Sequence, residues 1–145
     1  MIITPVTEET FPQAVEIYRD AWKESHKDIC SAAFLEERDY EAHVRSCLPG
    51  LFLLTDQEPV GIVRVHAGTL SNLYVHPVKQ GQGYGKQILA FAKEKQKTLR
   101  LTVLSTNIRA IGMYQKQGFR FTGNDKQLRE NLWEREMIVT ERDNG

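Results

Sequence analysis

Cysteine, charge of one sign and long apolar runs are all scarce in this sequence, and each shortage excludes a class of protein. The 145 residues include 2 cysteines, Cys30 and Cys47, without the close spacing of a zinc or redox motif, so we expect free thiols and no metal site. Lys+Arg and Asp+Glu both number 19, so no overall charge attracts nucleic acid or an anionic membrane. No apolar stretch approaches a signal peptide or a membrane span. The sequence therefore predicts a cytoplasmic protein that binds neither nucleic acid nor a membrane.

Linker-like tracts and internal repeats are also lacking. The length suits one ordinary domain, and 41% hydrophobic residues are enough for one buried core. We expect a single domain over residues 1–140 and a disordered tail over residues 141–145.

Apolar periodicity predicts an α/β fold with a twisted, mixed and mostly antiparallel sheet of six or seven strands and about four helices. The expected order is strand, two helices, three strands, helix, strand, helix and two strands. The first helix is expected to end near Glu24, and residues 25–38 show no clear pattern. The strand at 99–104 follows a helical crossover, so we expect it to run parallel to the strand at 69–75. A polar turn is expected over residues 123–131.

A glycine-rich turn, Gln80-Gly-Gln-Gly-Tyr-Gly85, lies between the strand at 69–75 and the next helix. Such a turn presents backbone N–H groups at a helix N-terminus, where the unpaired donors and the helix dipole favour an anion. The spacing matches neither a Walker A loop nor a Rossmann fingerprint, because the third glycine comes one residue early for the latter. The turn predicts a local phosphate site.

Two motifs resemble those of the GCN5-related N-acetyltransferases (GNAT), which transfer acetyl from acetyl-coenzyme A to an amine. The first is Gln80-x-x-Gly83-x-Gly85, preceded by Leu-Tyr-Val-His-Pro at 73–77. The second, Asn107-x-x-Ala-x-x-x-Tyr114-x-x-x-Gly-Phe119, matches at every fixed position. Both occur in the family's order, separated by one helix and one strand, so the resemblance implies a GNAT fold and an N-acetyltransferase that uses acetyl-CoA and no metal.

The resemblance also implies which residues hold the cofactor. Backbone amides of the glycine turn hold the pyrophosphate, helped by the Gln80 side chain and the Lys86 charge. Strand residues Leu73 and Val75 pair with the pantetheine arm, and the Leu73 N–H polarises the thioester carbonyl. Asn107 contacts the pantetheine or the opposite turn. The implied cofactor residues are Leu73, Val75, Gln80, Gly81, Gln82, Gly83, Tyr84, Gly85, Lys86 and Asn107.

Tyr114 is implied to protonate the departing thiolate in a direct attack within a ternary complex. A phenol with a pKa of about 10 facing a thiol with a pKa of about 8.5 suits that transfer; packing on the helix stripe is the alternative interpretation. Many relatives use a glutamate in the strand before the loop to deprotonate the amine. Thr69 stands at that position here, so a water relay through Thr69, Ser71 or His66, or an amine that arrives neutral, stays open.

The acceptor wall implied by the resemblance contains aromatic residues able to meet an amine by cation–π contact, with core packing as the alternative for each. The candidate substrate residues are Trp22, His26, Phe34 and Thr69. A small amine and a peptide amine both remain possible acceptors, and a homodimer is one possible assembly. A non-catalytic acyl-CoA sensor with the same fold is the alternative function, because the strand lacks the expected acid.

Overall fold

The structure is a computed structural model that describes residues 1–140, in which five α-helices, one short 3₁₀ helix and seven strands follow one another. The elements are β1 (Ile2–Pro5), α1 (Phe11–His26), α2 (Ala32–Glu37), α3 (Tyr40–Ser46), β2 (Leu51–Asp56), β3 (Glu58–His66), β4 (Thr69–Val75), η1 (Pro77–Lys79), α4 (Tyr84–Lys95), β5 (Leu99–Leu104), α5 (Ile108–Lys116), β6 (Arg120–Arg129) and β7 (Leu132–Val139). The tail expected at residues 141–145 lies outside the described residues.

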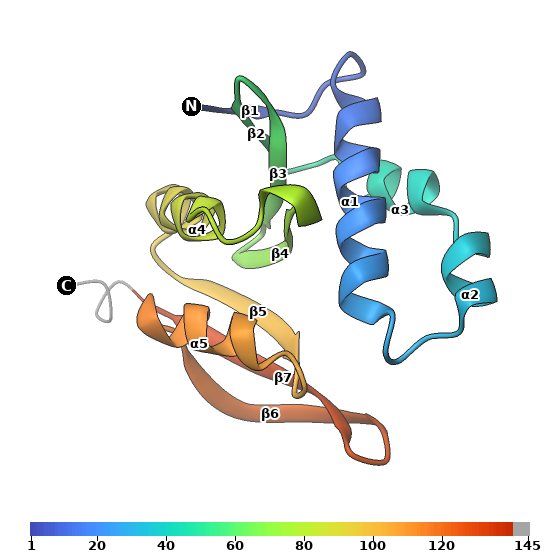
Figure 1. Cartoon of the computed structure of the whole chain (residues 1–145). Helices are drawn as coiled ribbons and strands as arrows, with labels where there is room; N and C mark the ends of the chain where they lie inside the picture. Colours follow the sequence, from blue (N-terminus) through green and yellow to red (C-terminus); the bar gives the residue numbers. More distant parts are fainter. Residues whose placement is uncertain (141–145) are drawn as a thin grey trace.

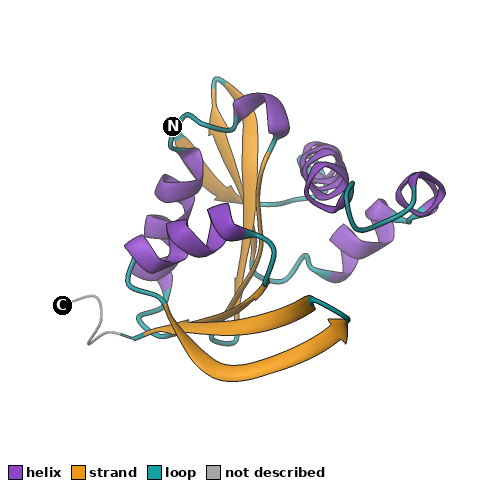
Figure 2. Ribbon diagram, turned by 60° about the horizontal axis from the view of Figure 1, so that its bottom comes forward, coloured by secondary structure: helices purple, strands orange, loops and turns teal. Residues whose placement is uncertain are grey.

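One twisted sheet with strand order β1-β2-β3-β4-β5-β7-β6 separates two groups of helices (Figure 1). Helices α4 and α5 cover one face, where Leu89, Ala92 and Ile111 join the larger core. Helices α1 and α3 cover the other face of the β1–β4 half, where Ala14 and Val44 join a second core. Figure 2 shows the β6–β7 hairpin curving away beneath α1 to α3. The predicted mixed α/β fold is confirmed.

Helix α2 was missing from the sequence prediction. Ser31 caps it by accepting a hydrogen bond from the Phe34 N–H at 3.1 Å, and Leu35 is its buried residue. A helix of 6 residues that buries one side chain shows no 3.6-residue periodicity. Helix α1 also runs to His26 instead of ending near Glu24.

The polar turn expected over residues 123–131 is mostly strand. Strand β6 extends to Arg129, and only Glu130 and Asn131 separate it from β7. Most of β6 is exposed, so it carries little of the apolar alternation that identifies a strand. Among the described residues, no helix is long and apolar enough to cross a membrane.

Strands β4 and β5 run parallel, as predicted, but they stay paired only at one end. Thr69 lies opposite Arg100, and no further pair forms along the described residues of these two strands. Asn72 has a φ of 52° and lies in a stretch where the β3–β4 register shifts, which is the geometry of a bulge that bends a strand. The two strands therefore diverge toward the glycine-rich loop and leave backbone groups of each unpaired.

Candidate active site

The glycine-rich loop after β4 presents backbone donors to open space. Gly81 and Gly83 have φ values of 80° and 86°, a region that glycine adopts without strain. Gly83 is the N-cap of α4 and no side chain caps the helix, so the N–H groups of its first turn have no intrahelical partner. A Cβ added at Gly81 or Gly83 would meet nothing within 4 Å. This loop fits the pyrophosphate of coenzyme A through its backbone.

Several side chains of the loop are occupied elsewhere. The Gln80 Nε2 donates to the Val75 carbonyl at 3.1 Å, the Tyr84 hydroxyl donates to Asp56 at 2.6 Å, and Lys79 forms an ion pair with Glu58. Lys86 is exposed on the first turn of α4. Backbone amides and Lys86 are thus the groups that the loop offers to an anion.

The space between β4 and β5 fits an extended arm. Leu73 and Val75 turn their side chains into the core beneath α4. The backbone groups of Leu73 face a strand that has moved away, whereas the Val75 carbonyl already accepts from the Gln80 side chain. An extended chain placed there would gain strand-like hydrogen bonds from β4. The predicted cofactor residues 73, 75 and 80–86 therefore form one continuous path from the opening to the start of α4.

Tyr114 lies on α5 in the core beneath the sheet, 8% exposed, with its ring centroid 5.6 Å from that of Phe119. Its hydroxyl makes no hydrogen bond within residues 1–140. Burial raises the pKa of Tyr114 to about 12, so the phenol keeps its proton at physiological pH. Among residues 1–140, the group is therefore a hydrogen-bond donor without a partner.

Asn107 caps α5, because its side-chain oxygen accepts from the Ala110 N–H at 3.2 Å. The side chain is exposed, so its amide N–H₂ group remains available to a ligand. The cap stabilises the start of the helix that carries Tyr114.

The aromatic residues predicted for the acceptor wall do gather. Trp22 and His26 stack with ring centroids 3.6 Å apart, and Phe34 lies 6.3 Å from Trp22. The fourth candidate, Thr69, lies apart from them on β4. Burial lowers the pKa of His26, although its hydrogen bond to the Trp22 carbonyl opposes the shift, so the ring is neutral at physiological pH.

Arg38 was missed by sequence reasoning and lies within this aromatic cluster. Its guanidinium carbon is 3.8 Å from the Trp22 ring centroid and 5.1 Å from that of Tyr40, and one nitrogen donates to the Tyr18 hydroxyl at 2.8 Å. The chain thus already places its own cation over the rings expected to receive an amine. No local pattern distinguishes Arg38 from its charged neighbours in the sequence.

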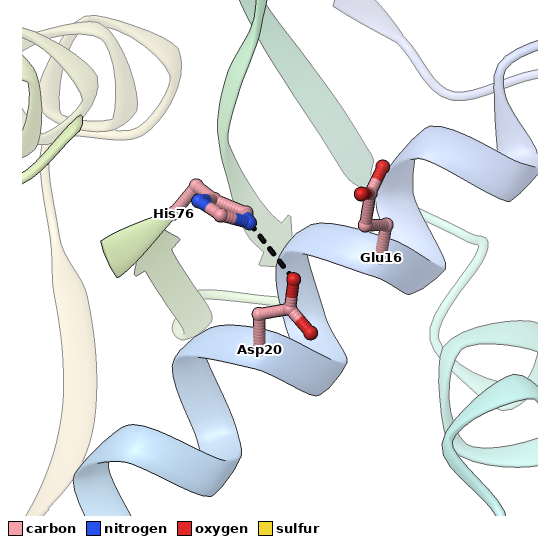
Figure 3. A group of neighbouring side chains, drawn as sticks. All are labelled: Glu16, Asp20 and His76. Carbon is pink, nitrogen blue, oxygen red and sulfur yellow. Dashed lines mark hydrogen bonds and ion pairs between the residues drawn. The ribbon is translucent and has the colours of Figure 1, made fainter. Parts of the chain in front are cut away.

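A second group that the sequence did not indicate joins α1 to the start of the loop. Figure 3 shows the His76 ring directed at Asp20, with Glu16 one turn away on α1; the His76 Nε2 lies 2.8 Å from the Asp20 Oδ2. The His76 Nδ1 accepts from the Val78 N–H, so Nε2 carries the proton and donates it. Burial alone would raise the pKa of Asp20, but hydrogen bonds from Arg19 and His76 outweigh it and the pKa is lowered. Both nitrogens of the His76 ring take part in hydrogen bonds, so this cluster holds the start of the loop against α1.

The structure thus combines a helix N-terminus without a side-chain cap, an opening between β4 and β5 and a buried phenol on α5, the features that the resemblance to acetyltransferases implies. A family model described as "Acetyltransferase (GNAT) domain" matches residues 49–121, and the chain belongs to that family. The resemblance seen in the two motifs is confirmed.

Named relatives agree with this membership. Peptidyl-lysine N-acetyltransferase YjaB of Salmonella typhimurium is 28% identical over 113 residues, covering 77% of this chain and 78% of that protein. Its Escherichia coli counterpart is 30% identical, covering 68% and 69%. The structure of PaiA N-acetyltransferase from Thermoplasma acidophilum in complex with coenzyme A superposes with a TM-score of 0.74 at 20% identity, covering 96% of this chain and 98% of that one.

Proposed function

We propose that this chain transfers an acetyl group from acetyl-CoA to a primary amine by direct attack in a ternary complex. The observation that carries the proposal is the opening between β4 and β5. It lies between the half of the sheet that ends in the loop at Gly81–Gly85 and the half that is covered by α5, the helix of Tyr114. A lysine side chain of a protein or peptide is the favoured acceptor, because relatives that share about two thirds or more of their length with this chain carry that name.

Each residue of the path has a part in the proposed reaction. Backbone N–H groups at the start of α4 hold the pyrophosphate. The Leu73 N–H donates to the thioester oxygen as negative charge develops there. Tyr114 donates a hydrogen bond to the leaving sulfur; with a pKa of about 12, full transfer to a thiolate of ordinary pKa about 8.5 is uphill, so the contact acts mainly while charge builds on sulfur.

The test is a panel of amines incubated with the protein and acetyl-CoA, with released thiol as the readout. The panel contains a lysine peptide with a blocked N-terminus, a peptide with a free N-terminus and no lysine, spermidine and an aminoglycoside. We expect thiol release that depends on the lysine peptide, and acetylation of its side chain by mass spectrometry. Thiol release with another amine alone would keep the transferase and replace the acceptor.

An acyl-CoA sensor is the alternative function, favoured by one observation. Thr69 stands where a carboxylate is expected in β4, and no acid occurs elsewhere in that strand. Tight binding of acetyl-CoA without thiol release from any amine of the panel would favour the sensor and reject the transferase.

A further inference from the structure

The proposed transfer needs a proton acceptor that β4 does not supply. A lysine side chain has a pKa of about 10.4, so near neutral pH it is almost entirely a charged ammonium that cannot attack. A positioned base close to the amine removes this obstacle. Resting on the proposed function, we propose that the carboxylate of Glu134 on β7 is this proton acceptor.

The strand registers place Glu134 on the acceptor side of the sheet. Tyr74 packs against Tyr18 of α1, so the side chains that alternate with the core beneath α4 face α1. Thr69 lies opposite Arg100, and Leu99, Leu101 and Val103 belong to the core beneath α4. Arg100, Thr102 and Leu104 therefore point to the α1 side. Glu136 lies opposite Thr102 and Glu134 opposite Leu104, so both carboxylates share that side.

Glu134 also lies at the correct height along the strands. Leu73, the residue proposed to bind the thioester oxygen, lies four residues after Thr69 on β4, and Leu104 lies four residues after Arg100 on β5. Because the bulge at Asn72 takes up one residue of β4, Leu73 lies about level with Val103, one residue before Leu104. Adjacent extended chains are about 4.8 Å apart, so the Glu134 backbone lies roughly 10 Å from an arm inserted between β4 and β5. A side chain leaning from β7 covers much of that distance, and one water can cover the rest.

Two other candidate proton acceptors near this opening, Glu136 and His76, are already engaged. Glu136 accepts from Thr122 at 2.9 Å and pairs with Arg100 at 3.2 Å. The His76 ring uses both nitrogens. Glu134 is half-exposed and makes no hydrogen bond or ion pair within residues 1–140, so its lone pairs are free.

The charged groups around Glu134 come from its neighbours in the sheet. Lys126 lies directly opposite it on β6, Glu136 shares its face of β7, and Arg100 lies on β5. The hairpin tip crosses toward the α1–α2 loop, where Arg129 donates to the Ile29 carbonyl at 3.1 Å.

The proton balance of the step is complete. The amine nitrogen forms a bond to the thioester carbon, and the carbon–sulfur bond breaks. The nitrogen loses two protons between ammonium and amide, which Glu134 accepts in turn and returns to solvent. Tyr114 donates a hydrogen bond to the departing sulfur and keeps its proton, and the thiolate takes one proton from solvent, so one proton is released per turnover.

The experiment compares the wild-type protein, Glu134→Gln and Glu136→Gln by thiol release between pH 6.5 and 10. It uses saturating acetyl-CoA and the amine of the panel that the wild-type protein acetylates fastest. Glu134→Gln is expected to lower kcat near pH 7 by about 100-fold, with the deficit shrinking as the amine loses its own proton at high pH. Glu136→Gln makes the same charge change on the same face and is expected to keep the wild-type pH profile. The thermal shift on adding coenzyme A should be equal in all three proteins.

The possible failures are distinguishable. Normal turnover by Glu134→Gln at every pH would reject Glu134 as the base while wild-type thiol release still supported the transferase. Equal losses with the same pH profile in both variants would show a general effect of charge and would also reject it. Absence of thiol release by the wild-type protein with every amine would remove the transferase and this inference together.

Discussion

Tyr114 illustrates what a motif can and cannot predict about a single side chain. Its spacing from Asn107 and Gly118 indicates its place on a helix and its implied role. Its pKa, however, is set by the packing of a core assembled from distant elements, including Phe119. The ordinary phenol pKa assumed from the sequence is therefore too low: burial raises it to about 12.

Replacing Tyr114 by Phe removes the hydroxyl and keeps the ring. Because the hydroxyl is proposed to contact the leaving sulfur only as charge develops, we expect kcat to fall by about 10- to 100-fold while the Kd of acetyl-CoA changes little. Steady-state thiol release and calorimetric binding measure the two quantities. A rise in Kd that matches the loss in turnover would instead assign the hydroxyl to ground-state binding.

The raised pKa of Tyr114 also makes the folded state sensitive to alkali. Above pH 10 the unfolded chain loses this proton while the folded chain retains it up to about pH 12. The contribution of Tyr114 to the free energy of unfolding is fully present below pH 10. Between pH 10 and about pH 12 it falls by up to about 1.4 kcal/mol per pH unit. Urea unfolding at pH 9, 10 and 11 should show a shallower decline for Tyr114→Phe than for the wild-type protein. Parallel declines would show that Tyr114 titrates normally.

At the scale of elements, the helices and strands that bury a regular row of side chains were predicted from the sequence, and those that bury few side chains were missed. Helix α4 and strand β5 alternate buried and exposed side chains in a regular pattern, and both were predicted. Helix α2 and the outer part of β6 bury little, so their sequences carry no periodic signal and they were missed. Helix α2 carries Phe34 of the predicted acceptor wall, and Arg129 at the end of β6 contacts the α1–α2 loop, so both irregular segments lie on the side where the acceptor is proposed to bind.

The loop between β4 and α4 yields a prediction about glycine. An alanine at Gly83, where φ is 86°, is strained and places a methyl group among the α4 N–H donors. We expect the Kd of coenzyme A to rise about tenfold, equivalent to about 1.4 kcal/mol, by titration calorimetry. Gly123→Ala is the matched control, since Gly123 has a φ of 88° and an equally open surrounding. An equal change in Kd for both variants would assign the effect to general destabilisation.

At the scale of the whole molecule, the sheet consists of two halves that separate where the ligand is proposed to lie. The sequence predicted a parallel β4–β5 contact, and the pair Thr69–Arg100 confirms it. The divergence beyond that pair was not predictable, because it arises from a bulge at Asn72 and from helices packing on both halves. The position of Glu134 follows from two strand registers in succession, that of β4 with β5 and that of β5 with β7, which no local sequence pattern predicts.

If the pantetheine arm fills this divergence as an additional strand, coenzyme A should slow amide hydrogen exchange in residues 71–75, whose backbone groups would gain partners. Strand β1, at the far edge of the sheet, serves as the internal control for overall stabilisation. Adenosine 3′,5′-bisphosphate, which carries phosphates but no pantetheine, should protect the start of α4 and leave residues 71–75 unchanged. Equal protection of residues 71–75 by both ligands would mean that binding at the loop closes the two halves by itself, and the opening would then not be the path of the arm.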